Sequence, residues 1–302
     1  MPDAGFELET VRILGFDRDA PWKNLALPYL IPTAVVAARR ILDRFRPNVV
    51  LGMGGYVMAP ALAAARMRGI PYVLHEKDVR PGLATRYFAA GAAAVCTTLP
   101  GTEQRLHRSV ILTGVPLREG FRLRTPDVPP RRLLVTGGSQ GARRLNEAVW
   151  AAIGSLTARF EEVIHVAGRQ GEEGVARHAG TPRYTGLTFT DDMASLMARA
   201  DLVVSRAGVS TIAEAAAVGL PMILIPGTFG GGHQEENASA IVDAGAAVRI
   251  QDGDLSADSL LAKVDSLDAD RLRSMAIASQ SLGRRDAARR VLAVLRDAAG
   301  KQ

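Results

Sequence analysis

Short apolar runs alternate with longer amphipathic stretches along most of the chain, and the runs end at glycine, proline or polar residues. Such runs are typical of strands buried on both faces, and the stretches between them carry apolar residues at helical spacing. The pattern therefore predicts an α/β fold in which helices connect parallel strands. The expected strands are residues 8–14, 49–52, 72–75, 94–97, 132–136, 163–167, 202–205 and 222–226.

A stretch rich in proline and arginine, residues 116–132, separates two such series of strands. Segments of this composition commonly connect domains, and a chain of 302 residues is long enough for two. We expect a first domain over residues 1–117 and a second over residues 118–284. The last amphipathic stretch, residues 285–302, predicts a helix that packs back on the first domain through its apolar face.

The composition narrows the class of protein. With 47% hydrophobic and 23% charged residues, the chain is typical of a soluble globular protein. Its single cysteine, Cys96, excludes an internal disulfide and a structural cysteine cluster for zinc, and favours a reducing compartment. The first residues lack the basic and apolar segments of a secretory signal. The longest apolar stretch, residues 25–38, contains Pro28 and Pro32 and is shorter than the roughly 20 residues of a spanning helix, so we expect no membrane crossing.

The formal net charge of +6 favours an anionic partner, but charge alone does not select one. The arginines are scattered along the chain, and aromatic residues make up only 5% of it. Proteins that bind single-stranded nucleic acid stack the bases on aromatic side chains. We therefore expect no nucleic-acid partner.

Glycine-rich turns follow three of the expected strands, within residues 49–67, 133–149 and 203–219. Each unit places a helix N-terminus at the carboxyl end of a strand, which is where open α/β sheets bind ligands. In the turn at residues 137–141, backbone N–H groups can approach a phosphate, and Ser139 adds a hydroxyl donor. One such turn can serve close packing alone, whereas three in one chain favour a nucleotide or anion site.

The same turns argue against two kinds of nucleotide site. A P-loop needs a lysine directly after its last glycine, and no lysine follows any of the three turns. A dinucleotide fingerprint at Gly52 and Gly54 needs a third small residue where this chain has Val57, although Glu76 stands where the acid of that fingerprint would. A dehydrogenase is therefore the weaker interpretation. The Asp-x-Asp pairs at 252–254 and 268–270 lie in an expected turn and on an expected helix surface, so we expect no metal and no other cofactor.

Longer motifs stand around these turns in a fixed order. They are LGMGGYVMAPALAAARMRGIPYVLHEKDVRPGL at 51–83, TGVPLR at 113–118, LLVTGGSQGARRLNEAV at 133–149, FTDDM at 189–193, ADLVVSRAGVSTIAEAAAVGLPMILIP at 200–226 and HQEENA at 233–238. In these motifs the chain resembles the MurG family of cytoplasmic glycosyltransferases, which move N-acetylglucosamine from UDP-N-acetylglucosamine to lipid I and so make lipid II for peptidoglycan. The resemblance implies two Rossmann-like domains of the GT-B type.

The resemblance also implies an inverting, metal-independent transfer, with the donor in the C-terminal half and the lipid acceptor in the N-terminal half. Carried over by position, Arg118 contacts the donor diphosphate, Ser139 the α-phosphate and Glu214 the ribose hydroxyls. Thr190 would contact the uracil edge through its backbone, and Gln234 the sugar. The expected donor side is completed by Asp78, Ser210 and Thr211, and the expected acceptor side consists of Gly54, Gly55, Tyr56, His75 and Glu76.

Two of these residues have simpler interpretations. Arg118 can be a surface charge of the hinge, and Glu214 can be one member of an ion pair on a helix. At residues 75–78 the chain reads HEKD where the family has HEQN. The carboxylate of Asp78 there either repels the diphosphate or acts as a substitute base.

A further departure concerns the first domain. The first glycine loop of the family, GTGGH, has no counterpart in this sequence, and its histidine is proposed in the family to act at the acceptor hydroxyl, so the general base is unassigned. We expect an incomplete N-terminal domain in which residues 8–14 pair elsewhere or remain unpaired. The alternative function is a UDP-sugar-binding protein, or a half-enzyme that needs the missing segment.

Residues 22–45 begin apolar, and arginines follow toward residue 46. In the family a similar region lies near the lipid acceptor, and such a surface suits anionic headgroups. A helix buried in the first domain, with Val35, Val36, Ile41 and Leu42 inside, would explain the same pattern. The resemblance implies a peripheral position at the cytoplasmic face of the inner membrane, with an anionic membrane surface as a partner beside UDP-N-acetylglucosamine and lipid I.

Overall fold

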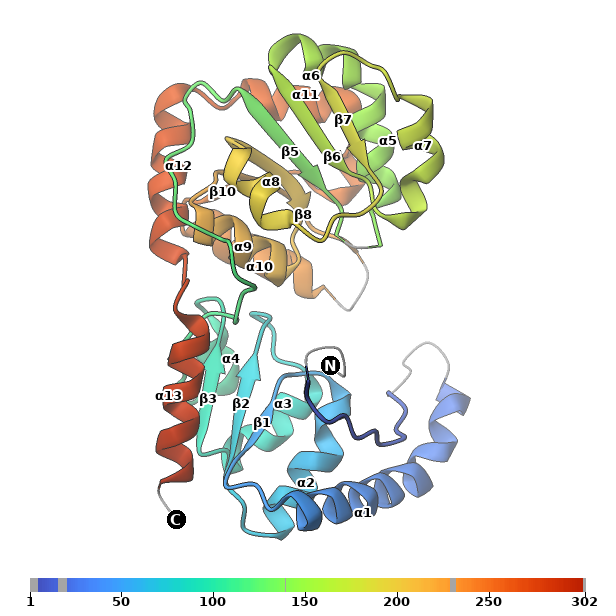
Figure 1. The fold of residues 1–302 in the computed structure, drawn as a ribbon, viewed down its shortest axis with the longest axis vertical. Helices are drawn as coiled ribbons and strands as arrows, with labels where there is room; N and C mark the ends of the chain where they lie inside the picture. The colour runs from blue at the N-terminus through green and yellow to red at the C-terminus, as the bar shows by residue number, and fades with distance from the viewer. Residues whose placement is uncertain (1–4, 16–20, 139, 229–231, 301–302) are drawn as a thin grey trace.

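The computed structural model describes residues 5–15, 21–138, 140–228 and 232–300. Two α/β domains lie one above the other, and each is built on a parallel sheet (Figure 1). The chain passes between them first through an irregular linker before residue 132 and again between α12 (Ala269–Leu282) and α13 (Ala287–Ala299). The predicted α/β architecture of two Rossmann-like domains is confirmed.

The N-terminal sheet has the order β1-β2-β3-β4 within the described residues, with all neighbouring strands parallel. Its strands are β1 (Val50–Gly52), β2 (Tyr72–Glu76), β3 (Ala94–Thr97) and β4 (Ile111–Leu112). Tyr72 and Leu74 pack in the cluster that contains α2 (Ala59–Met67) and α3 (Leu83–Phe88), whereas Val73 packs with Ala298 of α13. Alternate residues of β2 therefore face opposite layers, and α13 covers the second face of this sheet.

The C-terminal sheet has the order β10-β9-β8-β5-β6-β7, again with parallel neighbours. Because β6 and β7 extend to one side of β5 and β8 to β10 extend to the other, the chain changes direction between β5 and β8. Open α/β sheets bind their ligands at such a switch point. The strands are β5 (Arg132–Thr136), β6 (Glu162–Val166), β7 (Tyr184–Leu187), β8 (Leu202–Arg206), β9 (Met222–Ile225) and β10 (Ala247–Arg249).

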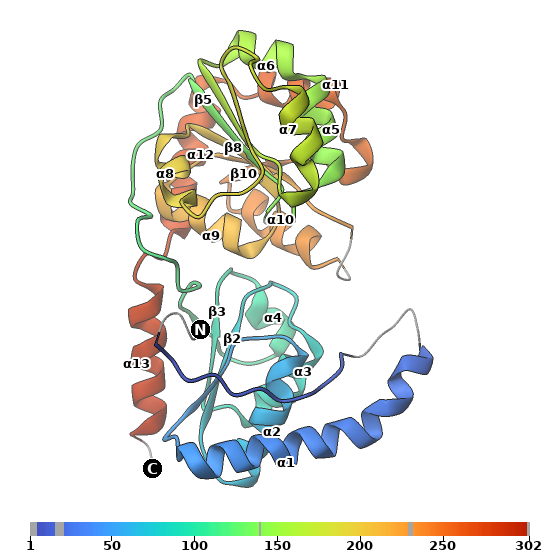
Figure 2. The same ribbon diagram turned by 45° about the vertical axis from the view of Figure 1, so that its right-hand side comes forward.

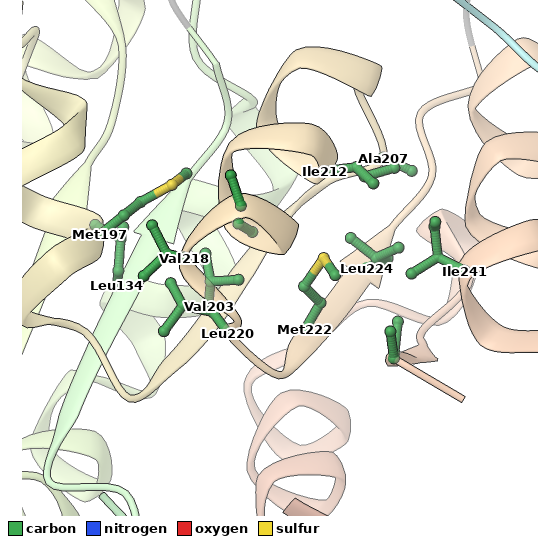
Figure 3. Packing of buried hydrophobic residues seen from close by; sticks show 14 of the residues in the cluster. Leu134, Met197, Val203, Ala207, Ile212, Val218, Leu220, Met222, Leu224 and Ile241 are labelled. Carbon is green, nitrogen blue, oxygen red and sulfur yellow. The ribbon is translucent and has the colours of Figure 1, made fainter. Parts of the chain in front are cut away.

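Helices cover both faces of the C-terminal sheet. On one face, Met222 and Leu224 meet side chains of three helices, and this layer is seen in Figure 3. On the other face, Ile223 and Ile225 pack with the remaining long helices of the domain. The first layer contains α8 (Met193–Arg199), α9 (Val209–Val218) and α10 (His233–Asp243); the second contains α5 (Arg143–Ala151), α6 (Ile153–Arg159), α11 (Ala257–Asp265) and α12.

Short helices complete the connections. They are α4 (Thr102–Leu106), α7 (Glu172–Arg177) and the 3-10 turns η2 (Pro21–Ala26), η3 (Tyr56–Met58), η4 (Ala89–Gly91), η5 (Arg169–Gly171) and η6 (Asp252–Asp254).

Of the expectations for residues 8–14, the strand is wrong, and the alternative that the segment remains unpaired agrees with the described residues. This segment has no regular secondary structure, and it is not paired in the described sheet, whose edge on that side is β1. Leu8 and Leu14 are exposed, and Glu9 is held by an ion pair with Arg44. Its alternating pattern suits a strand, but alternation produces a strand only where a neighbouring strand offers backbone partners.

The first long helix, α1 (Leu27–Phe45), corrects the expectation that prolines interrupt the apolar stretch. Pro28 lies in the first turn, where its missing N–H is harmless, and the helix continues through Pro32. Together with the preceding turn, residues 24–45 are long and apolar enough to cross a bilayer by length and composition, and 17% of the most apolar window is buried. The N-terminal half of α1 extends beyond the rest of the domain (Figure 2).

Three strands escaped the sequence pattern: β4, β7 and β10. All three lie at an edge of their sheet, and their residues are mostly half-buried or exposed. Edge strands bury less apolar surface than central ones and so lack a continuous hydrophobic run. Partial burial at an edge therefore accounts for the three missed strands, whereas the apolar run of β1, which also lies at an edge, was detected.

Half of the expected hinge is fixed to the C-terminal domain by the buried carboxylate of Asp201. Its Oδ1 accepts a hydrogen bond from the backbone N–H of Asp127 (3.0 Å) and pairs with the guanidinium of Arg124. Its Oδ2 accepts from the backbone N–H groups of Arg131 (3.1 Å) and Arg132 (3.0 Å). Residues 124–132 therefore belong structurally to the second domain, and only the earlier part of the linker connects the two.

Replacing this carboxylate with an amide, Asp201→Asn, should lower the free energy of unfolding by about 3 kcal/mol, because an NH₂ group would then face buried donors and Arg124 would lose its counter-charge. Urea unfolding followed by circular dichroism measures the change. Asp265→Asn, at a half-exposed ion pair with Arg159, is the matched control and should change stability by less than about 1 kcal/mol. Equal effects of the two substitutions would contradict this role for Asp201.

Candidate functional site

An open cleft of about 360 Å³ lies at the carboxyl ends of the C-terminal strands, next to the switch point. The last residues of β5 and β6 form its floor, and the first turns of α9 and the segment between β7 and α8 form its walls. It is lined by Arg118, Thr136, Gly138, Val166, Thr188, Phe189, Thr190, Met193, Ser210, Thr211 and Glu214. Of the expected donor residues, Arg118, Thr190, Ser210, Thr211 and Glu214 are thus brought together from the linker and two separate motifs.

The glycine turn after β5 presents backbone to this cleft. Gly138 has φ +83°, and a Cβ placed there would meet no atom within 4 Å, so the space beside it is open. Its N–H donates to Thr136 Oγ1 (3.2 Å), and the Gly141 N–H donates to the Gly138 carbonyl (3.0 Å). A glycine at this position allows a ligand to approach the main chain closely. Ser139, expected at the α-phosphate, lies outside the described residues.

The N-terminus of α9 points its unpaired amides at the same cleft. Its N-cap is Gly208, which has no side chain to satisfy the first N–H groups, and Ser210 and Thr211 lie in the first turn. The first turn of a helix carries partial positive charge and binds anions. The first turn of this helix therefore offers backbone donors to an anionic ligand, beside the open space at Gly138.

The side chains of Glu214 and Arg118 carry opposite charges that interact. Burial raises the pKa of the Glu214 carboxyl above its usual value, and the positive charge of Arg118 opposes that increase. Arg118 comes from the linker, and its Nη1 donates to the Asp191 carbonyl (3.3 Å) across the cleft. The linker thus places the Arg118 guanidinium where its charge acts on the Glu214 carboxylate of α9.

The wall between β7 and α8 contains side chains that the sequence analysis did not single out. Phe189 is partly exposed in the cleft, and the guanidinium of Arg169 lies 5.9 Å from the centre of its ring. Asp192 caps α8 by accepting from the Ser195 N–H (3.0 Å), and the hydrogen bond with Ser195 lowers the pKa of Asp192. The FTDDM motif indicates this wall, but of its residues only Thr190 is among those expected at the donor.

Gln234 does not line the cleft. Its Oε1 accepts from the N–H of Gly227 (2.8 Å), so in this structure the side chain fixes the loop that follows β9. Because this bond uses the oxygen, the amide nitrogen is the group that would donate to a ligand. The expected contact of Gln234 with the sugar stays a prediction.

Two expected acceptor residues have structural tasks. Glu76 Oε1 accepts from the backbone N–H groups of Lys77 (3.0 Å) and Asp78 (3.3 Å), and its Oε2 accepts from that of Gly82 (3.2 Å). His75 is fully buried, its Nε2 lies 2.8 Å from the carbonyl oxygen of Gly114, and burial lowers its pKa. Glu76 therefore shapes the loop after β2, His75 is tied to the segment after β4, and neither side chain stands open to an acceptor in this structure.

Asp78 connects the two domains. Its Oδ1 accepts from Asn237 Nδ2 (2.8 Å), and the neighbouring Val79 N–H donates to Asn237 Oδ1 (3.0 Å). A second contact joins Arg105 of α4 to Glu236 of α10 at 3.1 Å. The carboxylate at residue 78 thus has an amide partner across the domain boundary, which the sequence analysis did not foresee.

The remaining expected acceptor residues lie in the turn after β1. Gly54 and Gly55 have φ of +84° and +74°, and a Cβ at Gly54 would lie 3.8 Å from the carbonyl oxygen of His75. Tyr56 follows with 51% of its surface exposed. The carboxyl ends of β1 and β2 therefore bring these glycines beside the loop that contains Asp78.

Among the residues that the structure describes, no three His, Cys, Asp or Glu side chains come together in a group that could hold a metal ion. The expectation of a metal-independent reaction stays a prediction. Positive charge at the cleft comes instead from helix and turn amides and from Arg118.

Comparisons with known proteins agree with this geometry. Residues 132–291 match the glycosyltransferase family 28 C-terminal domain, and residues 1–97 match the glycosyltransferase family 28 N-terminal domain. The chain is 41% identical over 312 residues to the UDP-N-acetylglucosamine--N-acetylmuramyl-(pentapeptide) pyrophosphoryl-undecaprenol N-acetylglucosamine transferase of Nocardioides sp. (strain JS614), covering 98% of this chain and 85% of that protein. It is 39% identical to the protein of the same name from Syntrophotalea carbinolica, over 100% and 87% of the two chains.

Solved structures give the same picture. The crystal structure of Acinetobacter baumannii MurG is similar with a TM-score of 0.82 and 25% identity, over 98% of this chain and 86% of that one. A UDP-GlcNAc 2-epimerase from Neisseria meningitidis is similar with a TM-score of 0.63 at 14% identity, over 91% and 83% of the chains, and this likeness concerns the fold alone.

Removing the charge of the linker arginine, Arg118→Met, should raise the pKa of Glu214 further, because that charge is what opposes the effect of burial. The titration of the Glu214 carboxyl carbon by ¹³C NMR checks this shift. Arg122→Met, an exposed arginine in the same linker, is the control and should leave the titration unchanged. An unaltered Glu214 titration in Arg118→Met would show that the two charges do not interact.

Proposed function

The chain belongs to glycosyltransferase family 28, and from that premise we propose that it transfers N-acetylglucosamine from UDP-N-acetylglucosamine to lipid I, giving lipid II. This reaction is a step of peptidoglycan synthesis and serves cell-wall growth and division. The observation that carries the proposal is the cleft in which a glycine turn, a helix N-terminus and Arg118 converge at the switch point of the C-terminal sheet. Relatives that align with nearly the whole chain are named for this activity.

The chemistry needs a site that stabilises a departing diphosphate. In an inverting transfer, the acceptor hydroxyl oxygen forms a bond to the anomeric carbon while the bond from that carbon to UDP breaks. Negative charge then develops on the diphosphate, and fixed dipoles aimed at it lower the barrier. The amides of residues 137–141, the first turn of α9 and Arg118 would supply that stabilisation. The proton of the acceptor hydroxyl passes to a general base. No residue is assigned to this role, and Asp78 is the candidate.

The donor is proposed to lie along the cleft with its nucleoside toward α8 and α9. Glu214 would accept hydrogen bonds from the ribose hydroxyls, and Thr190 would meet the uracil edge through its backbone. Ser139 is proposed at the α-phosphate, and Gln234 at the sugar through its amide nitrogen. Phe189 offers an apolar face on the same wall.

The acceptor is proposed to enter from the N-terminal domain, whose α1 carries a surface suited to lipid. Leu25, in the preceding turn η2, and Tyr29, in the first turns of α1, are 83% and 74% exposed, and Arg39, Arg40 and Arg44 lie farther along α1 with exposed side chains. Exposed apolar side chains beside arginines fit a membrane that bears anionic lipids. Val35, Ile41 and Leu42 are half-buried, and Val36 is exposed. One face of this helix therefore packs against the domain, and another face is open to solvent. We propose a peripheral position at the cytoplasmic face of the inner membrane.

Purified protein supplied with UDP-N-acetylglucosamine and a lipid I analogue should release UDP. Arg118→Ala should lower kcat/KM about 100-fold, because a charge that faces the leaving diphosphate is lost, and Glu214→Gln should lower it about tenfold. Arg122→Ala and Glu173→Gln, both exposed outside the cleft, are the matched controls and should retain activity. UDP release is measured by a coupled assay.

Calorimetry with UDP separates the possible outcomes. Binding together with transfer supports the transferase. Binding without transfer would instead support a UDP-sugar-binding protein or a half-enzyme, and an absence of binding would contradict both.

Sedimentation with vesicles tests the membrane surface. Vesicles that contain anionic lipid should bind the protein at low salt and release it as salt is raised, because screening weakens the attraction of the arginines. Leu25→Asp combined with Tyr29→Asp should abolish binding, whereas Leu123→Asp, on the linker, should not. Protein that stays with the vesicles in high salt and carbonate would contradict a peripheral position and point to a spanning helix.

A further inference from the structure

We propose that Asn146, His165 and Tyr184 are positioning residues that hold the phosphate-binding turn of the cleft in its working shape. They form a polar chain behind the cleft, where the sheet meets α5; Asn146 and His165 are buried, Tyr184 is half-buried, and all three lie outside the cleft lining. The inference rests on the proposed function, since it assumes that residues 137–141 bind the donor diphosphate. It adds to that site Asn146, which lies within the motif at 133–149, and His165 and Tyr184, which lie outside every quoted motif.

Hydrogen bonds join the members into one continuous chain. Trp150 Nε1 donates to Tyr184 Oη (3.0 Å), and Tyr184 Oη lies 3.1 Å from His165 Nδ1. His165 Nε2 lies 3.1 Å from Asn146 Oδ1, and Asn146 Nδ2 donates to the carbonyl oxygen of Ala167 (2.8 Å). The members come from α5, β6 and β7, so the chain ties two neighbouring strands to the helix that follows the glycine turn.

The chain has only one arrangement of protons that satisfies all these groups. Asn146 Oδ1 can only accept, because its amide nitrogen already donates to Ala167, and therefore His165 Nε2 must carry the proton. His165 Nδ1 must then accept, so Tyr184 donates its hydroxyl proton to it while accepting from Trp150. Each member thus donates to the next, from Trp150 through Tyr184 and His165 to Asn146. This order fixes the neutral tautomer of His165 that is protonated at Nε2.

The far end of the chain reaches the glycine turn. The carbonyl oxygen of Ala167, held by Asn146, stands so close to Gly141 that any Cβ on Gly141 would overlap it. The backbone of Gly168 lies equally close to Gly141, so the turn after β5 and the turn after β6 pack main chain to main chain. If the Ala167 carbonyl lost its donor, it would be free to rotate against the turn that binds phosphate.

Small residues make this close packing possible. Gly168, Gly171 and Gly174 recur at every third position through η5 and α7. A Cβ on Gly171 would lie 3.1 Å from Asn146 Nδ2, and one on Gly174 would overlap the ring of Trp150. Gly168 thus leaves room for the turn after β5, Gly171 for the Asn146 amide and Gly174 for the Trp150 indole. This arrangement is expected if the polar chain fixes the positions of the three groups.

The surroundings of His165 keep it neutral. His165 is fully buried, and burial followed by the nearby charge of His178 lowers its pKa to about 4. The titratable groups that face it are Tyr184 on β7 and His178 after α7, whose ring stacks on Trp150. A proton on Nδ1 would have to point at the oxygen of Tyr184, and the Tyr184 hydroxyl would lose its acceptor. The chain therefore persists at neutral pH.

The variants Tyr184→Phe and Asn146→Ala test the proposal on the full chain. Tyr184→Phe keeps the ring and removes the hydroxyl, and Asn146→Ala removes the donor to Ala167. Each should weaken UDP binding in calorimetry about tenfold and raise the KM for UDP-N-acetylglucosamine by a similar factor. The kcat at saturating donor should stay within about twofold, because no group that touches the reacting atoms is changed.

A control separates positioning from simple loss of stability. Leu260→Ala removes fully buried apolar atoms from α11, which packs in the same helical layer as α5, and it leaves every hydrogen-bonding group of the polar chain in place. It should lower the Tm by at least as much as Tyr184→Phe while leaving UDP affinity unchanged. If Leu260→Ala weakens UDP binding as much as Tyr184→Phe does, the proposal is overturned. If Asn146→Ala does not fold, Tyr184→Phe alone decides the question.

A spectroscopic readout checks the tautomer directly. In ¹⁵N NMR, His165 should show a protonated Nε2 and an unprotonated Nδ1 from pH 8 down to about pH 5, and it should titrate only near its lowered pKa. The Asn146→Ala protein should lose this single fixed tautomer, because the acceptor at Nε2 is gone, whereas Tyr184→Phe should keep it. Failure of the wild-type protein to bind UDP would overturn the proposed function itself, whereas wild-type binding with unchanged affinity in Tyr184→Phe would overturn only this inference.

Discussion

A parallel sheet must be covered on both faces, and the architecture of this chain follows from that constraint. In the C-terminal domain, alternate residues of β9 bury into two different helical layers, and the helices of both layers come from the same half of the chain. The N-terminal sheet instead receives the cover of one face from α13, the last helix, which lies against Val73 and Cys96. The chain therefore has to return across the domain boundary, and the two domains are joined by two connections rather than one.

The same geometry concentrates positive potential where the strands end. Parallel strands all point their carboxyl ends to one edge, and each following turn or helix exposes unpaired N–H groups there. At the switch point between β5 and β8 no crossover fills the space, so the Gly138 turn and the N-terminus of α9 face one cleft. Arg118 is brought to it because Asp201 anchors the following part of the linker. The anion binding that we propose here would rest on the backbone, and side chains would add specificity.

Central strands and the cleft at the switch point could be predicted from the sequence, because buried strands form continuous apolar runs and three glycine turns at strand ends favour a nucleotide or anion site. The edge strands β4, β7 and β10 could not, since their burial is partial. Residues 8–14 show the opposite error, an alternating pattern without a partner strand. Five donor residues were placed together, but the tasks of Glu76 and Gln234 were not foreseen, because a loop's hydrogen bonds depend on neighbours far away in the chain. The polar chain at His165 likewise joins three elements and leaves no local pattern.

The HQEENA motif on α10 acquires a physical meaning only in three dimensions. Gln234 and Asn237 are three residues apart, so they project from neighbouring positions of one helix face. Gln234 holds the loop after β9 in the donor domain, and Asn237 holds Asp78 and Val79 in the loop after β2 of the other domain. One turn of helix thus fixes a donor-side loop and an acceptor-side loop relative to each other. A transfer between two bound substrates requires such a fixed separation, because a misplacement of about 1 Å is enough to slow the reaction about 100-fold.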